Sequence, residues 1–213
     1  VSKLEFIDNF EIIIINDGSE DLTEKNSKEL ESEFKNISYY KNEKNSGYGA
    51  SIKKGLMHVK YSKFMVVPGD NDMSTEAIVA TLTHLRSADL IMPFPVNTED
   101  RAKFRNILSK IYTLIYITFF DCNVNYINAP AIFPAEKVKS LKLPSNRNGI
   151  FSEIVTKLLH SDISFTEVPY FNRFQKKSRS TVKLSLLYDV AVTFIKLFIE
   201  IKIINRNKFL KKA

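Results

Sequence analysis

The stretch Glu11-Ile12-Ile13-Ile14-Ile15-Asn16-Asp17-Gly18-Ser19 carries the strongest fold signal of this sequence. Its run of isoleucines predicts a β-strand that is covered on both faces, as in a parallel sheet. The Asn-Asp-Gly-Ser that follows predicts a tight turn, although such turns are also common without a function. In open α/β sheets, ligands bind at the carboxyl ends of the strands. The stretch therefore predicts an α/β sheet with a candidate ligand-binding turn at Asp17.

A second acidic turn follows a second apolar strand. Phe64-Met65-Val66-Val67-Pro68 precedes Gly69-Asp70-Asn71-Asp72. Two carboxylates two residues apart offer oxygen ligands to one Mg²⁺ or Mn²⁺, and that ion would neutralise a departing diphosphate. The alternative is a solvated acidic turn that caps a helix beginning near Ser74. Acidic turns after two strands favour nucleotide-sugar chemistry.

A glycine-bearing loop lies between the two acidic turns. Asn45-Ser46-Gly47-Tyr48-Gly49-Ala50 opens a predicted helix that runs through about His58. Small residues allow close backbone approach, and the amino end of a helix favours phosphate. Simple packing of a helix on a strand is the alternative interpretation of these glycines.

Composition and charge limit the class of protein. The chain has 213 residues, of which 44% are hydrophobic and 26% charged, so it is globular with a substantial core. The net charge of +7 is concentrated from Arg173 to the end, which suits nucleic acid, an anionic membrane or a phosphorylated substrate. No nucleic-acid-binding motif accompanies it, so we expect no nucleic-acid partner. The single Cys122 excludes an internal disulfide and fits a reducing compartment.

Strand-like and helix-like segments alternate along the chain, which predicts a mostly parallel sheet with helices on its faces. Beyond the two strands above, we expect strands at 37–40, 89–92 and 164–168, with the second stopped by Pro93. Helices are expected at 21–34, 76–86, 101–120 and 151–160. The pattern indicates one catalytic domain over residues 1–181, followed by a helix and tail over 182–213.

The two acidic turns and the glycine loop together resemble family 2 inverting glycosyltransferases. Residues 14–23, Ile-Ile-Asn-Asp-Gly-Ser-Glu-Asp-Leu-Thr, are similar to the nucleotide-binding turn of that family, and Asp70-Asn71-Asp72 to its Asp-x-Asp motif. The resemblance implies a Rossmann-like, three-layer fold of the glycosyltransferase A type and a GDP- or UDP-hexose donor. It assigns metal binding to Asp70 and Asp72, and a catalytic role to Asp72. It assigns donor binding to Asp17, Gly18, Ser19, Asn45, Gly47, Gly49 and Asp70.

Basic residues in the second half are similar to those of polyprenyl-phosphate sugar transferases, the subgroup of dolichyl-phosphate mannose synthase. Arg101 and Arg105 are one helical turn apart, and guanidinium groups bind phosphate through bidentate contacts. A solvated surface pair is the alternative. The resemblance assigns the acceptor phosphate to these two arginines and to Arg173, Lys176 and Arg179 of a basic loop.

Glu153 is a candidate catalytic base, in Phe151-Ser152-Glu153. A hydroxyl acceptor in surface polysaccharide or glycolipid synthesis would need such a base, whereas a phosphate acceptor is already ionised. The alternative is a carboxylate that is favourable at a helix start.

The tail predicts peripheral attachment to the cytoplasmic face of a membrane. Leu184, Leu187, Ala191, Phe194, Phe198 and Ile201 form one apolar stripe, while charges within the segment disfavour a spanning helix. An amphipathic helix at an anionic lipid surface fits this pattern. Packing of the helix on the catalytic domain or on a second subunit is the alternative.

The family begins with an apolar strand that ends in Pro-x-Tyr-Asn-Glu, and this sequence has no counterpart of it. We therefore expect the catalytic domain to be incomplete at its N-terminus. A catalytically inactive, membrane-associated scaffold is a third hypothesis.

Overall fold

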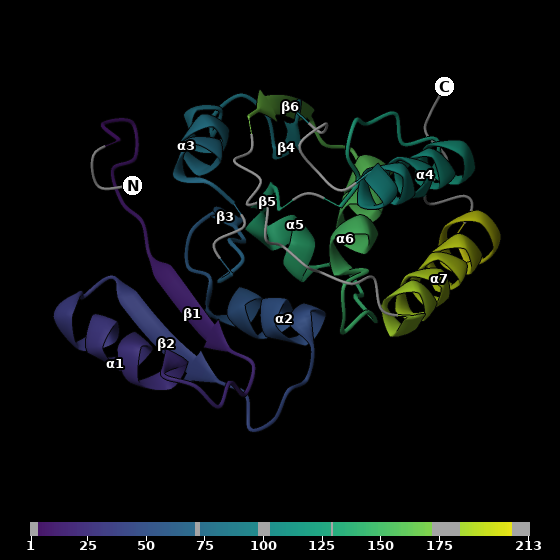
Figure 1. Cartoon of the computed structure of the whole chain (residues 1–213). Helices are drawn as coiled ribbons and strands as arrows, with labels where there is room; N and C mark the ends of the chain where they lie inside the picture. Colours follow the sequence, from purple (N-terminus) through teal and green to yellow (C-terminus); the bar gives the residue numbers. More distant parts are fainter. Residues whose placement is uncertain (1–3, 71–72, 98–102, 129, 172–183, 206–213) are drawn as a thin grey trace.

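The structure, a computed structural model, describes residues 4–70, 73–97, 103–128, 130–171 and 184–205. In these residues strands and helices alternate, as predicted (Figure 1). The strands are β1 (Ile12–Asn16), β2 (Ile37–Lys41), β3 (Lys63–Met65), β4 (Leu90–Pro95), β5 (Ile132–Pro134) and β6 (Phe165–Tyr170). The helices are α1 (Thr23–Glu33), α2 (Tyr48–His58), α3 (Thr75–Thr83), α4 (Lys103–Phe120), α5 (Ala135–Lys139), α6 (Ile150–Leu159), α7 (Leu184–Phe198) and the π-helix η2 (Ile199–Ile204).

The strands form two sheets. β1 pairs in parallel with β2, and the other sheet has the order β3-β5-β4-β6. In that sheet β3, β4 and β6 run in one direction, and only β5 is antiparallel to its neighbours. The expected mostly parallel α/β architecture is therefore confirmed, with β5 as its one reversed strand.

The prediction that β1 is covered on both faces was wrong. Ile12 is 42% exposed, and the three isoleucines after it are only partly buried. Among the described strands β1 pairs only with β2, in a two-stranded sheet that is separate from the main sheet. Figure 1 shows β1, β2 and α1 at one end of the molecule, away from the main sheet.

The prediction that Pro93 ends a strand was also wrong, because β4 continues through Pro95. Leu90 and Val96 donate their amides to carbonyls of Ser164 and Tyr170, so alternate residues of β4 direct their amides toward β6. Pro93 and Pro95 occupy the other set of positions, on the side of β5. That side pairs with β5 only at Ile91, so neither proline removes a ladder hydrogen bond.

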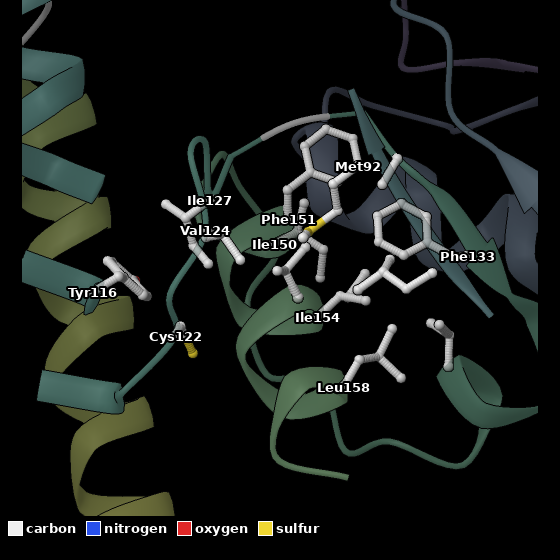
Figure 2. Close-up of a cluster of buried hydrophobic side chains, with 14 of the residues drawn as sticks. Met92, Tyr116, Cys122, Val124, Ile127, Phe133, Ile150, Phe151, Ile154 and Leu158 are labelled. Atoms are coloured by element: carbon white, nitrogen blue, oxygen red, sulfur yellow. The ribbon is translucent and has the colours of Figure 1, made fainter. Parts of the chain in front are cut away.

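The main core surrounds α6. Nine consecutive residues of this helix, 150–158, are buried, and Figure 2 shows Ile150, Phe151, Ile154 and Leu158 within the cluster. Leu197 of α7 and Ile201 of η2 belong to the same cluster. The tail helix therefore packs on the catalytic domain, which was the alternative interpretation of its apolar stripe. Among the residues described, no helix is both long and apolar enough to cross a membrane.

Candidate nucleotide-sugar site

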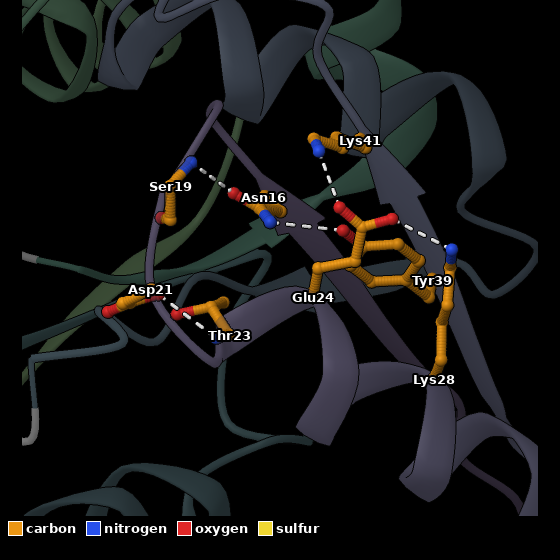
Figure 3. Close-up of polar contacts among 8 residues, drawn as sticks. All are labelled: Asn16, Ser19, Asp21, Thr23, Glu24, Lys28, Tyr39 and Lys41. Carbon is orange, nitrogen blue, oxygen red and sulfur yellow. Dashed lines mark hydrogen bonds and ion pairs between the residues drawn. The ribbon is translucent and has the colours of Figure 1, made fainter.

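The first acidic turn is built by Asn16 and closed by Asp17. Asn16 is buried at the end of β1, accepts a hydrogen bond from the Ser19 amide at Oδ1 (2.8 Å) and donates from Nδ2 to the Tyr39 hydroxyl (3.0 Å), as Figure 3 shows. Gly18 has a φ of +78°, a conformation that side chains rarely adopt. This geometry holds the turn at the carboxyl end of β1, where the sequence predicted it.

Asp17 joins this turn to the glycine loop. Its Oδ1 accepts hydrogen bonds from Asn42 Nδ2 (2.8 Å) and the Ser46 amide (2.9 Å), and its Oδ2 accepts one from the Gly47 amide (2.9 Å). Partial burial raises the pKa of Asp17, but the hydrogen bonds from Asn42, Ser46 and Gly47 outweigh it, so the pKa lies below 3.8. Asp17 is therefore an ionised group that orders the loop on which the other donor-site candidates lie.

The glycines of the loop permit close packing against another backbone segment. A Cβ at Gly47, where φ is +96°, would lie 2.6 Å from the Asn146 carbonyl oxygen. A Cβ at Gly49 would lie 2.8 Å from the carbonyl carbon of the same residue, and Ala50 donates its amide to the Asn146 oxygen (3.0 Å). The close approach that these glycines allow is thus made to the segment before α6.

The second acidic turn interacts electrostatically with the start of α2. Asp70 is exposed in the turn after β3, and its charge acts on the hydroxyl of Tyr48. Burial, and then the negative charge of Asp70, raise the pKa of Tyr48 to about 12, so this hydroxyl is protonated. The backbone amide of Gly47 binds Asp17, and the next residue, Tyr48, is subject to the charge of Asp70. The glycine loop therefore brings the two acidic turns to one region.

Side-chain oxygens accept backbone amides at the starts of α1 and α3. Asp21 Oδ1 accepts the Thr23 amide at the start of α1 (2.9 Å). At α3 the cap is the Ser74 hydroxyl, which accepts the Ala77 amide (3.2 Å). Capping of α3 therefore does not require Asp70.

Glu153 lies in a buried ion network. The residue is 2% exposed, its Oε1 accepts from Lys157 Nζ (3.0 Å), and its Oε2 accepts the Ser145 amide (3.1 Å). Lys157 also lies 2.9 Å from Glu200 Oε2 and donates to the Lys142 carbonyl (2.5 Å). Burial raises the pKa of Glu153 despite the neighbouring Lys157. Both oxygens of Glu153 are therefore engaged: the residue joins α6 to the segment before it, and Lys157 extends the network to Glu200 of η2. Glu153 also lines a small pocket together with Thr193 and Lys196 of α7.

Several predicted site residues lie outside the described part of the chain. These are Asp72, Arg101, Arg173, Lys176 and Arg179, together with the side chain of Arg105, the backbone of which belongs to α4. Within the described residues, no group of three or more His, Cys, Asp or Glu side chains could hold a metal.

Sequence reasoning missed three residues of this region. Asn42 holds Asp17, the hydroxyl of Tyr48 is subject to the charge of Asp70, and Lys157 neutralises Glu153. Only Lys157 had a local signal, because it follows Glu153 by four residues on the same helix. The other two contacts join segments that are distant in the sequence.

Comparisons with known proteins bear on the family and the fold. The model of the family described as glycosyl transferase family 2 matches residues 2–130, more than half of the chain. Comparison with the sequences of curated proteins gave no significant match.

Solved structures of two synthases share the fold at low identity. Mannosyl-3-phosphoglycerate synthase from Rubrobacter xylanophilus superposes with a TM-score of 0.67 and 12% identity, over 95% of this chain and 66% of that chain. Glucosyl-3-phosphoglycerate synthase from Mycobacterium tuberculosis, with phosphoglyceric acid, gives 0.60 and 14%, over 89% and 68%. Another structure of the latter holds Mn²⁺, UDP-glucose and phosphoglyceric acid, with a TM-score of 0.59 and 13% identity over 87% and 68%. The fold is of the glycosyltransferase A type, and the chain belongs to glycosyltransferase family 2.

Proposed function

We propose that this glycosyltransferase moves a hexose from a GDP- or UDP-hexose to a polyprenyl phosphate, with inversion at the anomeric carbon. It would act at the cytoplasmic face of a membrane, with residues 182–213 at the anionic lipid surface. The donor half of the proposal is supported by the convergence of Asp17, the glycine loop and Asp70. The M. tuberculosis synthase with UDP-glucose and Mn²⁺ supports a nucleotide sugar and a divalent ion.

In this scheme Asp17 and its loop bind the nucleotide, and Asp70 with Asp72 would hold Mg²⁺ or Mn²⁺. The fit of Asp70 is chemical: it is an exposed carboxylate on a strand-end turn, and hard divalent cations prefer such oxygens. The Tyr48 hydroxyl, on which the charge of Asp70 acts, is buried and has no hydrogen-bond partner within the described structure, so it is a polar group that a ligand entering here would satisfy. The ion would neutralise the diphosphate as the sugar departs.

The acceptor half rests on the state of Glu153. A hydroxyl acceptor needs a base, whereas an ionised phosphate does not. Because both oxygens of Glu153 accept hydrogen bonds from Lys157 and Ser145, this carboxylate is poorly placed to take a proton from an acceptor. The phosphate would be received by Arg101, Arg105, Arg173, Lys176 and Arg179.

A hydroxyl acceptor is the second candidate. Two structures of the M. tuberculosis synthase, which has the same fold, contain phosphoglyceric acid, and this supports a small phosphorylated acceptor as an alternative to a lipid phosphate. A carboxylate such as Glu153 would then act as the base.

Transfer of radiolabelled hexose tests the proposal. UDP- and GDP-hexoses are offered with polyprenyl phosphate, polyprenol or phosphoglycerate, with Mn²⁺, Mg²⁺ or EDTA. We expect a radiolabelled lipid product only with polyprenyl phosphate as acceptor. Mild acid should hydrolyse this product, because it is a glycosyl phosphate. EDTA should abolish the transfer. Transfer to phosphoglycerate alone would overturn the proposed acceptor.

The variant Glu153→Gln separates the two acceptors. With a phosphate acceptor kcat should stay within about threefold, whereas removal of a general base would lower it by about 10²- to 10⁴-fold. Calorimetry with UDP and GDP in Mn²⁺ addresses the scaffold hypothesis, since an inactive scaffold would bind neither nucleotide.

A further inference from the structure

Helix α4 presents a row of large apolar side chains to solvent. Its opposite face is covered, since Tyr116 and Phe120 are fully buried. Apart from the consecutive Leu114 and Ile115, the exposed residues recur every three or four positions, which places them on one face of the helix. They are Phe104 (70% exposed), Ile107 (57%), Ile111 (48%), Leu114 (60%), Ile115 (37%) and Phe119 (45%).

The tail helix adds a second exposed apolar row. Leu197 and Ile201 face the core, while Ile195 (55%), Ile199 (40%) and Ile203 (64%) are exposed at intervals of four residues. The segment α7–η2 is therefore apolar on two sides, of which the described residues cover only one.

An aromatic seam joins the two rows. The ring of Phe119 lies 5.5 Å from that of Phe194 and 5.9 Å from that of Phe198, both edge to face. Phe119 belongs to the exposed row of α4, and Ile195 and Ile199 directly follow the two partner rings in sequence. Figure 1 shows α4 and α7 together at the end of the molecule opposite β1. We call the exposed rows of α4 and α7–η2 the apolar platform.

The charges around the apolar platform favour an anionic partner. Lys103, Lys110 and Lys196 are exposed, and the sequence of α4 contains no Asp or Glu. The nearby carboxylates face cations of the protein: Asp121 lies 2.8 Å from Lys202, Asp189 lies 3.6 Å from Arg147, and Glu200 lies 2.9 Å from Lys157.

A second copy of the chain is a poorer fit to this surface. A two-fold contact through α4 would bring Lys103 and Lys110 of both copies into one interface, and α4 offers no carboxylate to either pair. A bilayer surface accepts both features, because apolar side chains enter the acyl boundary and lysines meet anionic headgroups.

We propose that the apolar platform, with α4 as its larger part, seats the protein on the surface of an anionic bilayer. This deepens the proposed function and rests on it for the membrane-held acceptor. The platform extends the attachment surface well beyond the tail helix, to a helix that begins two residues after Arg101 in the sequence. Two adjoining amphipathic rows would also fix the orientation of the domain, which a single helix would not.

Tryptophan fluorescence tests insertion directly, because the chain contains no Trp. Ile111→Trp and Leu114→Trp place a probe on the apolar platform, and Met57→Trp, at a position 73% exposed on α2, is the matched control. With phosphatidylcholine–phosphatidylglycerol vesicles we expect a blue shift and quenching by brominated lipid for both platform probes, and neither for the control. The absence of a shift in both platform probes would overturn the proposal.

Vesicle sedimentation of charge variants measures the contribution of α4. Ile111→Glu and Leu114→Glu should each lower partitioning at least about tenfold, while Met57→Glu stays within about twofold. Unchanged partitioning of the α4 variants, or a dimer that Ile111→Glu dissociates without any vesicle binding, would overturn it. A transfer assay of Leu114→Glu with a short-chain, water-soluble polyprenyl phosphate separates membrane seating from the proposed sugar transfer. Loss of vesicle binding with retained transfer concerns the platform alone, and loss of transfer with retained vesicle binding concerns the proposed function alone.

Discussion

Replacement of Lys157 by Met tests the buried network between α6 and η2. The Lys157 side chain is 1% exposed, and its Nζ lies 3.0 Å from Glu153 Oε1 and 2.9 Å from Glu200 Oε2. Removal of one partner of a buried ion pair costs about 3–5 kcal/mol, because the remaining charge is uncompensated. Since two carboxylates lose their cation here, we expect the free energy of unfolding at pH 7.5 to fall by at least about 3 kcal/mol.

The loss should depend on pH in a defined direction. Burial holds the pKa of Glu153 above 4.5 in the folded protein, and removal of Lys157 takes away the main cause that lowers it. The folded state then binds the Glu153 proton more tightly than the unfolded state, so stability falls as pH rises from 4.5 through the folded pKa. The deficit of Lys157→Met should therefore be smallest near pH 4.5 and largest well above the raised pKa.

Urea unfolding followed by circular dichroism, at pH 4.5 and 7.5, measures this difference. Lys196→Met, at an exposed position of α7, is the control, and its stability should change by less than about 0.5 kcal/mol. The double variant Lys157→Met/Glu153→Gln should recover part of the lost free energy of unfolding, because one of the two uncompensated carboxylates is removed. If Lys157→Met alone does not fold at pH 7.5, the folding of the double variant at that pH serves as the test. A deficit below about 1 kcal/mol at pH 7.5, or an equal one at both pH values, would refute the reasoning.

Three further predictions concern the donor site. Asp17→Asn should lower the free energy of unfolding at pH 7 by about 1 kcal/mol, because the new side-chain NH2 group would face the N–H donors that the carboxylate now accepts. Since the pKa of Asp17 is lowered in the folded protein, this loss should shrink as pH falls below 3.8. Urea unfolding at pH 7 and below pH 3.8 measures both effects. Tyr48→Phe should weaken UDP binding in Mn²⁺ about fivefold in calorimetry without loss of stability, and unchanged affinity would exclude the hydroxyl from the site. Gly47→Ala should cost more than about 2 kcal/mol, from its φ of +96° and the 2.6 Å contact of its Cβ, whereas Gly69→Ala, with open space around it, should be close to neutral in thermal unfolding.

The secondary structure was largely predictable, since its signals are local. The turn at Asp17, the helix opened by the glycine loop and the helix around Glu153 all follow from periodicity, glycine and flanking polar residues. Where prediction was wrong, pairing decided. The sequence does not show that Pro93 lies on the side of β4 that has no partner strand beyond Ile91 among the described residues. It also does not show that β1 lies in a two-stranded sheet outside the main one, where Ile12 is exposed.

The candidate site divides in the same way. Sequence alone placed the acidic turns at strand ends and assigned the chain to the correct family, because spacing between motifs survives in the linear order. Periodicity also showed that α4 and the tail are amphipathic, but it does not state what covers an apolar face. Only the tertiary structure brought Glu200 to Lys157, Asn42 to Asp17 and Tyr48 to the vicinity of Asp70, and left the face of α4 bare. These outcomes depend on contacts between distant segments, and the burial that gives each charge or apolar side chain its energy exists only after folding.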